Sequence, residues 1–135
     1  MRLTVAMLAD SAQVSAGKLY VLGGAFDTIN ARAFPAAVRG LSVVLVAEIL
    51  PSDRNRDLPI GIRLYDEDGN ALGIESRGMM RVGAPSTLPA GASSLVPLVA
   101  SFVGLRFAKP GGYVFILDNE GEELGRIPFR VREAT

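Results

Sequence analysis

The sequence predicts an all-β protein: a single-domain antiparallel β-sandwich, immunoglobulin-like or jelly-roll-like, with little or no helix. Long segments alternate apolar and polar residues with a period of two, which is the pattern of a half-buried strand. Turn residues recur at intervals of one strand length and predict eight or nine short strands in one domain over residues 1–135. No segment longer than about ten residues has helical apolar spacing between capping residues.

Three segments show the clearest alternation. In residues 2–8 and 60–65, apolar side chains at every second position are separated by polar or small ones. In residues 127–132, Ile, Phe and Val alternate with Pro128 and two arginines. Because proline has no N–H to donate to a neighbouring strand, residues 126–132 are predicted to form an edge or bulged strand.

Two other segments, residues 41–50 and 95–107, are apolar at both odd and even positions. In a two-layer sandwich only one face of a strand meets the core, so the second apolar face needs another cover. We expect a second subunit to supply it, which makes the protein a homo-oligomer; the alternative is that loops such as residues 51–59 fold over that face. The candidate interface residues are Val44, Val46, Val96, Leu98 and Phe102.

Three short fragments resemble parts of known active sites, and none completes a motif. Gly17-Lys18 lacks the first glycine and the hydroxyl residue of a phosphate-binding loop, which favours a hairpin corner. Gly23-Gly24 lacks the spacing of a dinucleotide site and favours a bulge or tight turn before a strand over residues 25–31. Asp27-Thr28 is not followed by the glycine of an aspartic protease.

Two acidic turns resemble each other. Residues 64–73 read LYDEDGNALG and residues 116–125 read ILDNEGEELG, which predicts two similar β-hairpins with a glycine at positive φ in each turn. Asp66, Asp68 and Asn70 alternate as at the start of a calcium loop. The glycine comes one residue early and the distal glutamate is missing, so no metal site is expected.

The composition excludes several kinds of chemistry. The chain has no cysteine and no histidine, so disulfides, thiol catalysis and Ser-His-Asp triads are excluded, and zinc loses its usual ligands. The 14 basic and 14 acidic residues give no net charge to attract nucleic acid. We therefore expect no catalytic residue and no cofactor. Catalysis by a pair of carboxylates, as in glycosidases, is not excluded by the composition because it needs neither histidine nor cysteine.

No segment is expected to enter a membrane. The first apolar residues do not read as a signal peptide, and the longest apolar run, residues 95–105, is too short to span a bilayer. The simplest expectation is a cytoplasmic protein.

Two functional hypotheses follow. The first is a non-catalytic assembly or protein-interaction module, favoured by the doubly apolar strands. The second is a small-ligand or carbohydrate-binding sandwich, with or without carboxylate-based hydrolase activity. Its candidate cleft residues are Asp27, Tyr65 and Asp66, with the Pro- and Gly-rich segment 83–94 as an irregular surface loop and candidate lid.

Both ends of the chain carry a resemblance. The opening LTVAMLADSAQVSAGKLYVLGGAFDTI and the closing FAKPGGYVFILDNEGEELGRIPFRV resemble a family of small bacterial proteins, found often in actinobacteria, that has no assigned activity. This resemblance implies a bacterial origin and implies no site residue. The segment KPGGYVFIL also resembles the P-G-x-Y-x-F pattern of immunoglobulin-like sandwiches, which implies that Tyr113, Phe115 and Leu117 face the core.

Overall fold

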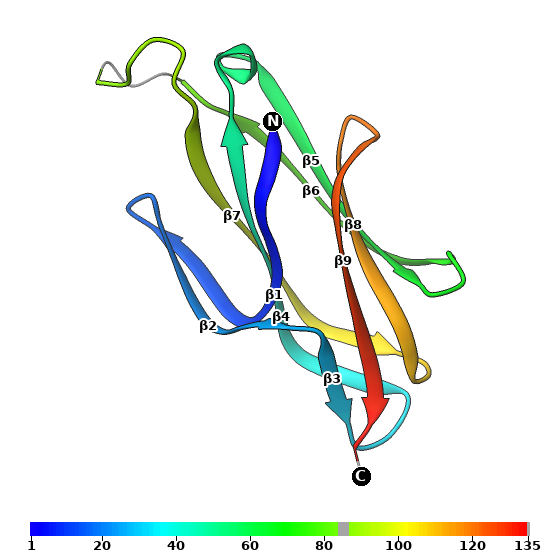
Figure 1. The fold of residues 1–135 in the computed structure, drawn as a ribbon. Coiled ribbons are helices and arrows are strands. Elements are labelled where there is room, and N and C mark those ends of the chain that lie inside the picture. Colours follow the sequence, from blue (N-terminus) through cyan, green and yellow to red (C-terminus); the bar gives the residue numbers. More distant parts are fainter. Residues whose placement is uncertain (84–86, 135) are drawn as a thin grey trace.

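The computed structural model describes residues 1–83 and 87–134. These residues form a β-sandwich with one short 3-10 turn, η1, at Pro51–Asp53 (Figure 1). The described strands are β1 (Arg2–Ser15), β2 (Lys18–Phe26), β3 (Thr28–Ala31), β4 (Ala36–Ile49), β5 (Asp57–Asp66), β6 (Ala71–Arg81), β7 (Ser94–Phe107), β8 (Gly111–Asn119) and β9 (Glu122–Glu133). The predicted all-β sandwich is confirmed.

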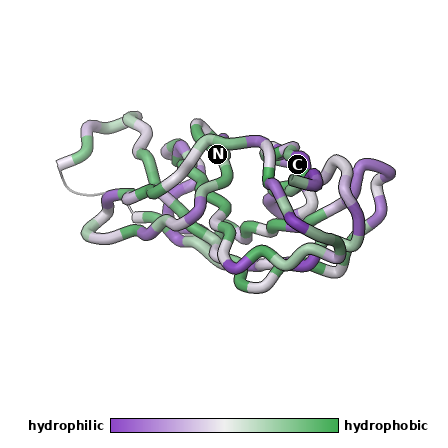
Figure 2. The backbone as a smooth tube through the Cα atoms, turned by 90° about the horizontal axis from the view of Figure 1, so that it is seen from below, coloured by the Kyte–Doolittle hydropathy of each residue, from purple (hydrophilic) through white to green (hydrophobic). Residues whose placement is uncertain are grey.

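The strands form two sheets. Sheet A has the order β2-β1-β4-β7, and sheet B has the order β3-β9-β8-β5-β6. Hydrophobic and hydrophilic residues alternate along most strands in Figure 2, as expected where one face of a strand meets the core and the other meets solvent. The pairing is antiparallel except between β3 and β9, which run parallel.

The core lies between the sheets and is rich in aromatic side chains. Phe115 stacks on Phe129 with ring centroids 5.5 Å apart, and Phe107 meets Tyr113 edge-on at 4.7 Å. Tyr113, Phe115 and Leu117 are all buried in the main apolar cluster. The inward orientation implied by the KPGGYVFIL segment is confirmed.

The two doubly apolar strands, β4 and β7, pair with each other over most of their length. On β4, Leu41, Val43 and Leu45 belong to the core cluster, so the residues between them face outward from sheet A. Sheet A therefore has apolar side chains on both of its faces.

Residues 126–132 are predicted to be an edge or bulged strand, and the edge alternative is wrong because β9 lies between β3 and β8. The register shift between β8 and β9 falls at Leu117/Asp118, opposite residues 123–125, so the irregularity lies just before the segment. Pro128 is accommodated for a local reason. β3 pairs only with Arg130–Glu133, so the nitrogen of Pro128 lies where β9 has a neighbour on one side alone.

The prediction of a continuous strand over residues 25–31 is also wrong. The chain leaves sheet A after Phe26 and enters sheet B at Thr28. The bulge expected near Gly23-Gly24 is confirmed: Gly23 and Ala25 have φ of 63° and 61°, and the pairing register shifts opposite them.

The predicted hairpins are confirmed at all three turns. Ala16-Gly17 joins β1 to β2 with φ of 51° and 73°. In the two acidic turns, Gly69 and Gly121 have φ of 83° and 82°. These left-handed conformations are the reason for the two similar glycine positions.

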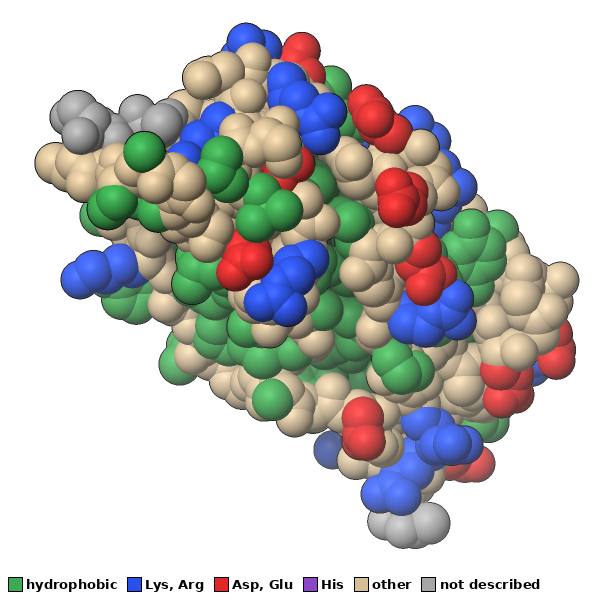
Figure 3. All heavy atoms as spheres, turned by 45° about the horizontal axis from the view of Figure 1, so that its top comes forward, with side chains coloured by type: hydrophobic (Ala, Val, Ile, Leu, Met, Phe, Trp, Pro, Cys, Tyr) green, Lys and Arg blue, Asp and Glu red, His purple; other side chains and the backbone are tan. Residues whose placement is uncertain are grey.

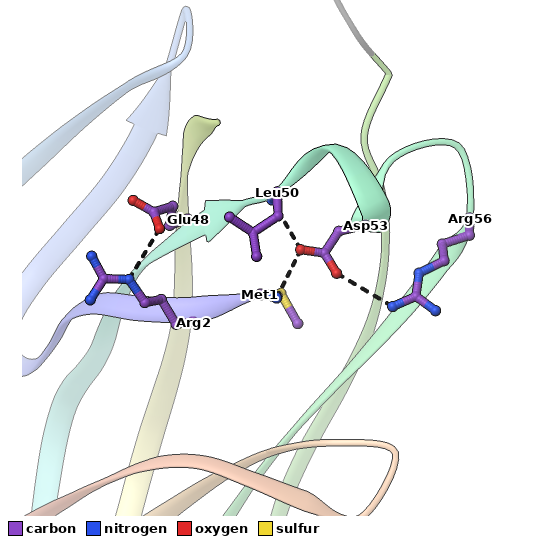
Figure 4. Close-up of polar contacts among 6 residues, drawn as sticks. All are labelled: Met1, Arg2, Glu48, Leu50, Asp53 and Arg56. Carbon is purple, nitrogen blue, oxygen red and sulfur yellow. Dashed lines mark hydrogen bonds and ion pairs between the residues drawn. The ribbon is translucent and has the colours of Figure 1, made fainter. Parts of the chain in front are cut away.

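A buried carboxylate anchors one end of the sandwich (Figure 4). Asp53 Oδ2 lies 2.8 Å from the amino group of Met1 and accepts a hydrogen bond from the Leu50 N–H at 3.0 Å. Arg56 donates to Oδ1 at 3.3 Å. Burial raises the pKa of Asp53, but the hydrogen bonds from the Met1 amino group and the Leu50 N–H outweigh it, and the pKa is lowered.

Candidate functional site

The outer face of sheet A is apolar and is here named the apolar face. Alternation along the paired strands places Val5, Tyr20, Leu22, Leu95 and Val103 on it. The exposed fractions are 37% for Val5, 52% for Tyr20, 73% for Leu22, 62% for Leu95 and 88% for Val103. In Figure 3 hydrophobic side chains gather in the left half of the view, interrupted by one adjacent acidic and basic side chain, while most other charged side chains lie above and to the right.

The centre of the apolar face contains no charged side chain. Between the exposed residues lie Met7, Val44, Val46, Pro97 and Val99, which pair across β1, β4 and β7. Val44 is fully buried even though it faces outward, because Met7 and Val99 flank it on both sides. A patch of this kind is unusual on a monomeric protein and marks interaction sites.

The five candidate interface residues do not lie on one face of sheet A but are divided between its two faces. Val44 and Val46 lie on the apolar face. Val96, Leu98 and Phe102 point inward and pack against the core clusters, where Phe102 stacks on Phe115 at 5.5 Å. The outward-facing residues of β7 are instead Leu95, Pro97, Val99 and Val103.

The outer face of sheet B is charged. Ion pairs cross it between Arg63 and Asp118, between Arg81 and Asp57, and between Arg77 and Glu75. The two outer faces of the sandwich thus differ in chemistry: one is apolar and the other is covered with paired charges.

A groove of about 570 Å³, here named the sheet B groove, lies on that charged face. It runs across β5, β8 and β9. Its lining includes Tyr65, Asp66, Glu67, Gly112, Val114, Ile116, Arg126, Pro128 and Arg130. A volume of this size falls within the range of small-molecule sites.

The structure brings together two of the three candidate cleft residues, because Tyr65 and Asp66 both line the sheet B groove. Asp27 does not line it. Its carbonyl oxygen accepts the N–H of Arg130 at 2.8 Å, and its carboxylate accepts the Thr28 hydroxyl at 3.0 Å.

None of the described residues of the segment 83–94 lines the groove, which gives its assignment as a lid no support. Arg54 donates to Ala92 O and Ser94 Oγ at 2.9 and 3.2 Å, which holds the segment beside the start of β5. Tyr65 and Asp66 lie at the other end of β5. Residues 87–93 contain no helix or strand, in agreement with an irregular loop, and residues 84–86 lie outside the described part.

The Asp66 carboxylate is occupied by its own turn. It accepts hydrogen bonds from the backbone N–H groups of Asn70 and Asp68 at 2.8 and 3.0 Å, and from the Asn70 side chain at 3.1 Å. The backbone and side-chain hydrogen bonds from Asn70 lower the pKa of Asp66. A carboxyl group that stays ionised is unsuited to the general-acid role in glycoside hydrolysis.

No cluster of metal-ligating side chains occurs in the described ranges 1–83 and 87–134. Those ranges also contain no helix of the length and hydrophobicity needed to cross a membrane.

Comparison with protein families decides the relationship of the chain. A family of unknown function, DUF6941, matches residues 4–132. The chain belongs to this family. The family matches almost the whole sandwich and assigns no activity to it, and no curated protein matches the chain. The apolar face and the sheet B groove are therefore the features that bear on function.

Two features of these surfaces were not predicted from the sequence. Tyr20 and Leu22 join the apolar face because β2 pairs with β1, and Arg130 joins Tyr65 because β8 lies between β5 and β9. Alternation indicated that Arg130 points outward, but nothing local indicated which strand would be its neighbour.

Proposed function

We propose that the chain is a non-catalytic assembly module that pairs with a second copy of itself through the apolar face. The observation that supports this most strongly is the row of outward-facing apolar side chains on β4 and β7 that ends in Val103, which is 88% exposed. Leaving such a surface in water forgoes about 25 cal/mol for each Å².

The size of the apolar face suits a specific interface. With about 4.8 Å between strands and about 3.3 Å per residue, the four strands of sheet A present roughly 800 Å² on this side. Specific complexes of standard size bury roughly 800 Å² per partner. One copy of the face thus supplies about the area that a stable dimer needs.

A second copy is the partner best matched to this chemistry. At one end of the face Arg2 and Glu48, beside Leu95, pair with each other at 3.1 Å, so the face offers little charge pattern that would select a basic or an acidic partner. Two such faces related by a two-fold axis complement each other. Stacked sheets pack about 10 Å apart with interdigitated side chains. The proposed dimer is therefore a four-layer stack with the two A sheets in the middle.

Pairing of the β7 edges is a less suitable mode of assembly. Pro97 lies within the ladder that β7 forms with β4, opposite Val46. A proline fits there when its nitrogen faces away from the neighbouring strand, so Pro97 offers no donor to a strand added at the free edge.

Light scattering on charge-introducing variants tests the proposal. Val103→Asp places a carboxylate in the proposed interface, where burial of an unpaired charge is costly. We expect the wild-type chain to scatter at twice its 14.3 kDa mass and the variant to dissociate with an affinity loss of about a hundredfold.

Met79→Asp is the matched control. Met79 is 66% exposed and lies on β6, where its neighbour Met80 is buried in the core, so Met79 points outward from sheet B and not from the outer face of sheet A. This variant is expected to keep the dimeric mass. A wild-type chain that is monomeric at high micromolar concentration, or equal dissociation of both variants, would contradict the proposal.

The ligand-binding hypothesis has one observation in its favour, which is that Tyr65 and Asp66 line the same groove. The groove lies on the opposite side of the sandwich from the apolar face. Occupation of the groove and pairing of the apolar faces are therefore compatible. The hydrolase form of this hypothesis is disfavoured by the lowered pKa of Asp66.

A further inference from the structure

The sheet B groove has an acidic wall, an apolar floor and a basic wall. Asp66 and Glu67 at the end of β5 form the first wall, β8 contributes the floor, and Arg126 and Arg130 of β9 form the second wall. The lining therefore carries two negative and two positive groups on opposite sides.

The acidic wall is held in place by two glycines. Glu67 Oε2 accepts the N–H of Gly112 at 3.2 Å. A Cβ atom at Gly111 or at Gly112 would lie 3.0 Å from a carboxylate oxygen of Glu67, so a side chain at either position would displace the Glu67 carboxylate. The absence of side chains at this pair lets the acidic turn dock beside the floor.

The two arginines of the basic wall differ in their partners. Arg126 donates to both carboxylate oxygens of Glu123, at 3.2 and 2.6 Å. Arg130 makes no side-chain hydrogen bond or ion pair within the described part of the chain. The guanidinium group of Arg130 therefore keeps all five of its N–H donors for a ligand, whereas Arg126 uses two of its nitrogens on Glu123. A carboxylate is the ligand group that a guanidinium binds through two parallel hydrogen bonds.

The floor favours a flat ligand with an apolar face. Tyr65, Val114 and Pro128 lie in one row across β5, β8 and β9. Sugar rings combine an apolar face with hydroxyl groups at their edges. Those hydroxyls can donate to the acidic wall, while a second anionic group on the ligand would be repelled there.

We propose that the sheet B groove binds a hydroxylated monocarboxylate the size of one sugar unit, such as a uronic acid. The carboxylate pairs with Arg130, the ring lies over Val114 and Pro128, and its hydroxyl groups donate to the Glu67 carboxylate, because Asp66 is already occupied by its own turn. This site is independent of the proposed dimer, since it uses the other sheet.

Titration of the ¹⁵N-labelled chain with sodium glucuronate, followed by amide chemical shifts, tests the site. We expect saturable shifts at the amides of Gly69 and Gly112 and their neighbours. Glucose, which lacks the carboxylate, and sulfate, which lacks the ring, are each expected to bind at least about tenfold more weakly. Equal binding of sulfate would show a simple anion site and overturn the proposal.

Two arginine variants complete the experiment. Arg130→Gln removes the charge and is expected to weaken glucuronate binding by about tenfold or more. Arg132→Gln is the matched control, because Arg132 lies on the same face of β9, outside the groove, and donates to Asn30 at 2.7 Å. Binding that survives Arg130→Gln, or the absence of saturable shifts in the folded wild-type chain, would refute the assignment.

Discussion

At the scale of single residues, Asp53 is the charged group on which stability depends most clearly. Its side chain is 5% exposed and lies between the Met1 amino group and Arg56. Removing one member of a buried ion pair leaves the other without a partner, which costs much more than losing a surface pair.

We predict that Asp53→Asn lowers the free energy of unfolding by about 3 kcal/mol. Asp57→Asn, which removes the exposed partner of Arg81, is expected to cost less than about 1 kcal/mol. Urea denaturation of both variants measures the difference. Equal, small losses would show that the buried pair contributes no more than a surface pair.

The same group predicts a pH dependence. Because the pKa of Asp53 is lowered in the folded chain, its stabilising contribution is complete above the ordinary pKa of an aspartate, near 4. It is lost as the pH falls from there toward the lower folded-state pKa. Thermal unfolding between neutral and acid pH should show this loss in the wild type and a smaller one in Asp53→Asn. Parallel curves would refute it.

Gly78 and Gly104 both have room for a side chain and differ in backbone conformation, so alanine substitutions at the two positions measure the effect of conformation alone. A Cβ atom at Gly78 or at Gly104 would meet no atom within 4 Å, but Gly104 has φ of 71°. We predict that Gly78→Ala stabilises the chain by about 0.5 kcal/mol, because alanine lowers the conformational entropy of the unfolded chain. Gly104→Ala should destabilise it by about 1 kcal/mol through left-handed strain. Denaturant midpoints that shift in the same direction would contradict this account.

At the scale of elements, hydrogen bonds within the acidic β5–β6 turn account for the alternation of Asp66, Asp68 and Asn70. The Asp66 carboxylate accepts hydrogen bonds from the backbone N–H groups of Asp68 and Asn70 in its own turn. We predict that calorimetry detects no calcium binding at micromolar affinity. A micromolar site that disappears in Asp68→Ala would overturn this interpretation.

Strand positions and orientations could be predicted from the sequence because they depend on local alternation. Tyr113 and Phe115 face the core for that reason. The move of the chain from sheet A to sheet B near Asp27 could not be predicted, since it depends on which strands become neighbours. The same limit applies to the sheet B groove. Tyr65 and Asp66 are adjacent in the chain, whereas Arg130 reaches them only through the pairing of β8 with β9.

At the scale of the whole molecule, the two outer faces differ in surface chemistry. Sheet B presents paired charges and a groove, which suit contact with water and a polar ligand. Sheet A presents Val5, Leu95 and Val103 around a centre that lacks charges. Pairing of two A sheets covers the apolar face and leaves both grooves open to solvent.

Isotope-filtered NMR on a mixture of labelled and unlabelled chains tests this arrangement most directly. The account predicts intermolecular contacts from the methyl groups of Val5, Leu95, Val99 and Val103, and none from Met79 on sheet B. A mixture without intermolecular contacts at a concentration where the chain is saturated, or contacts from Met79 in place of Val103, would contradict the pairing of the apolar faces.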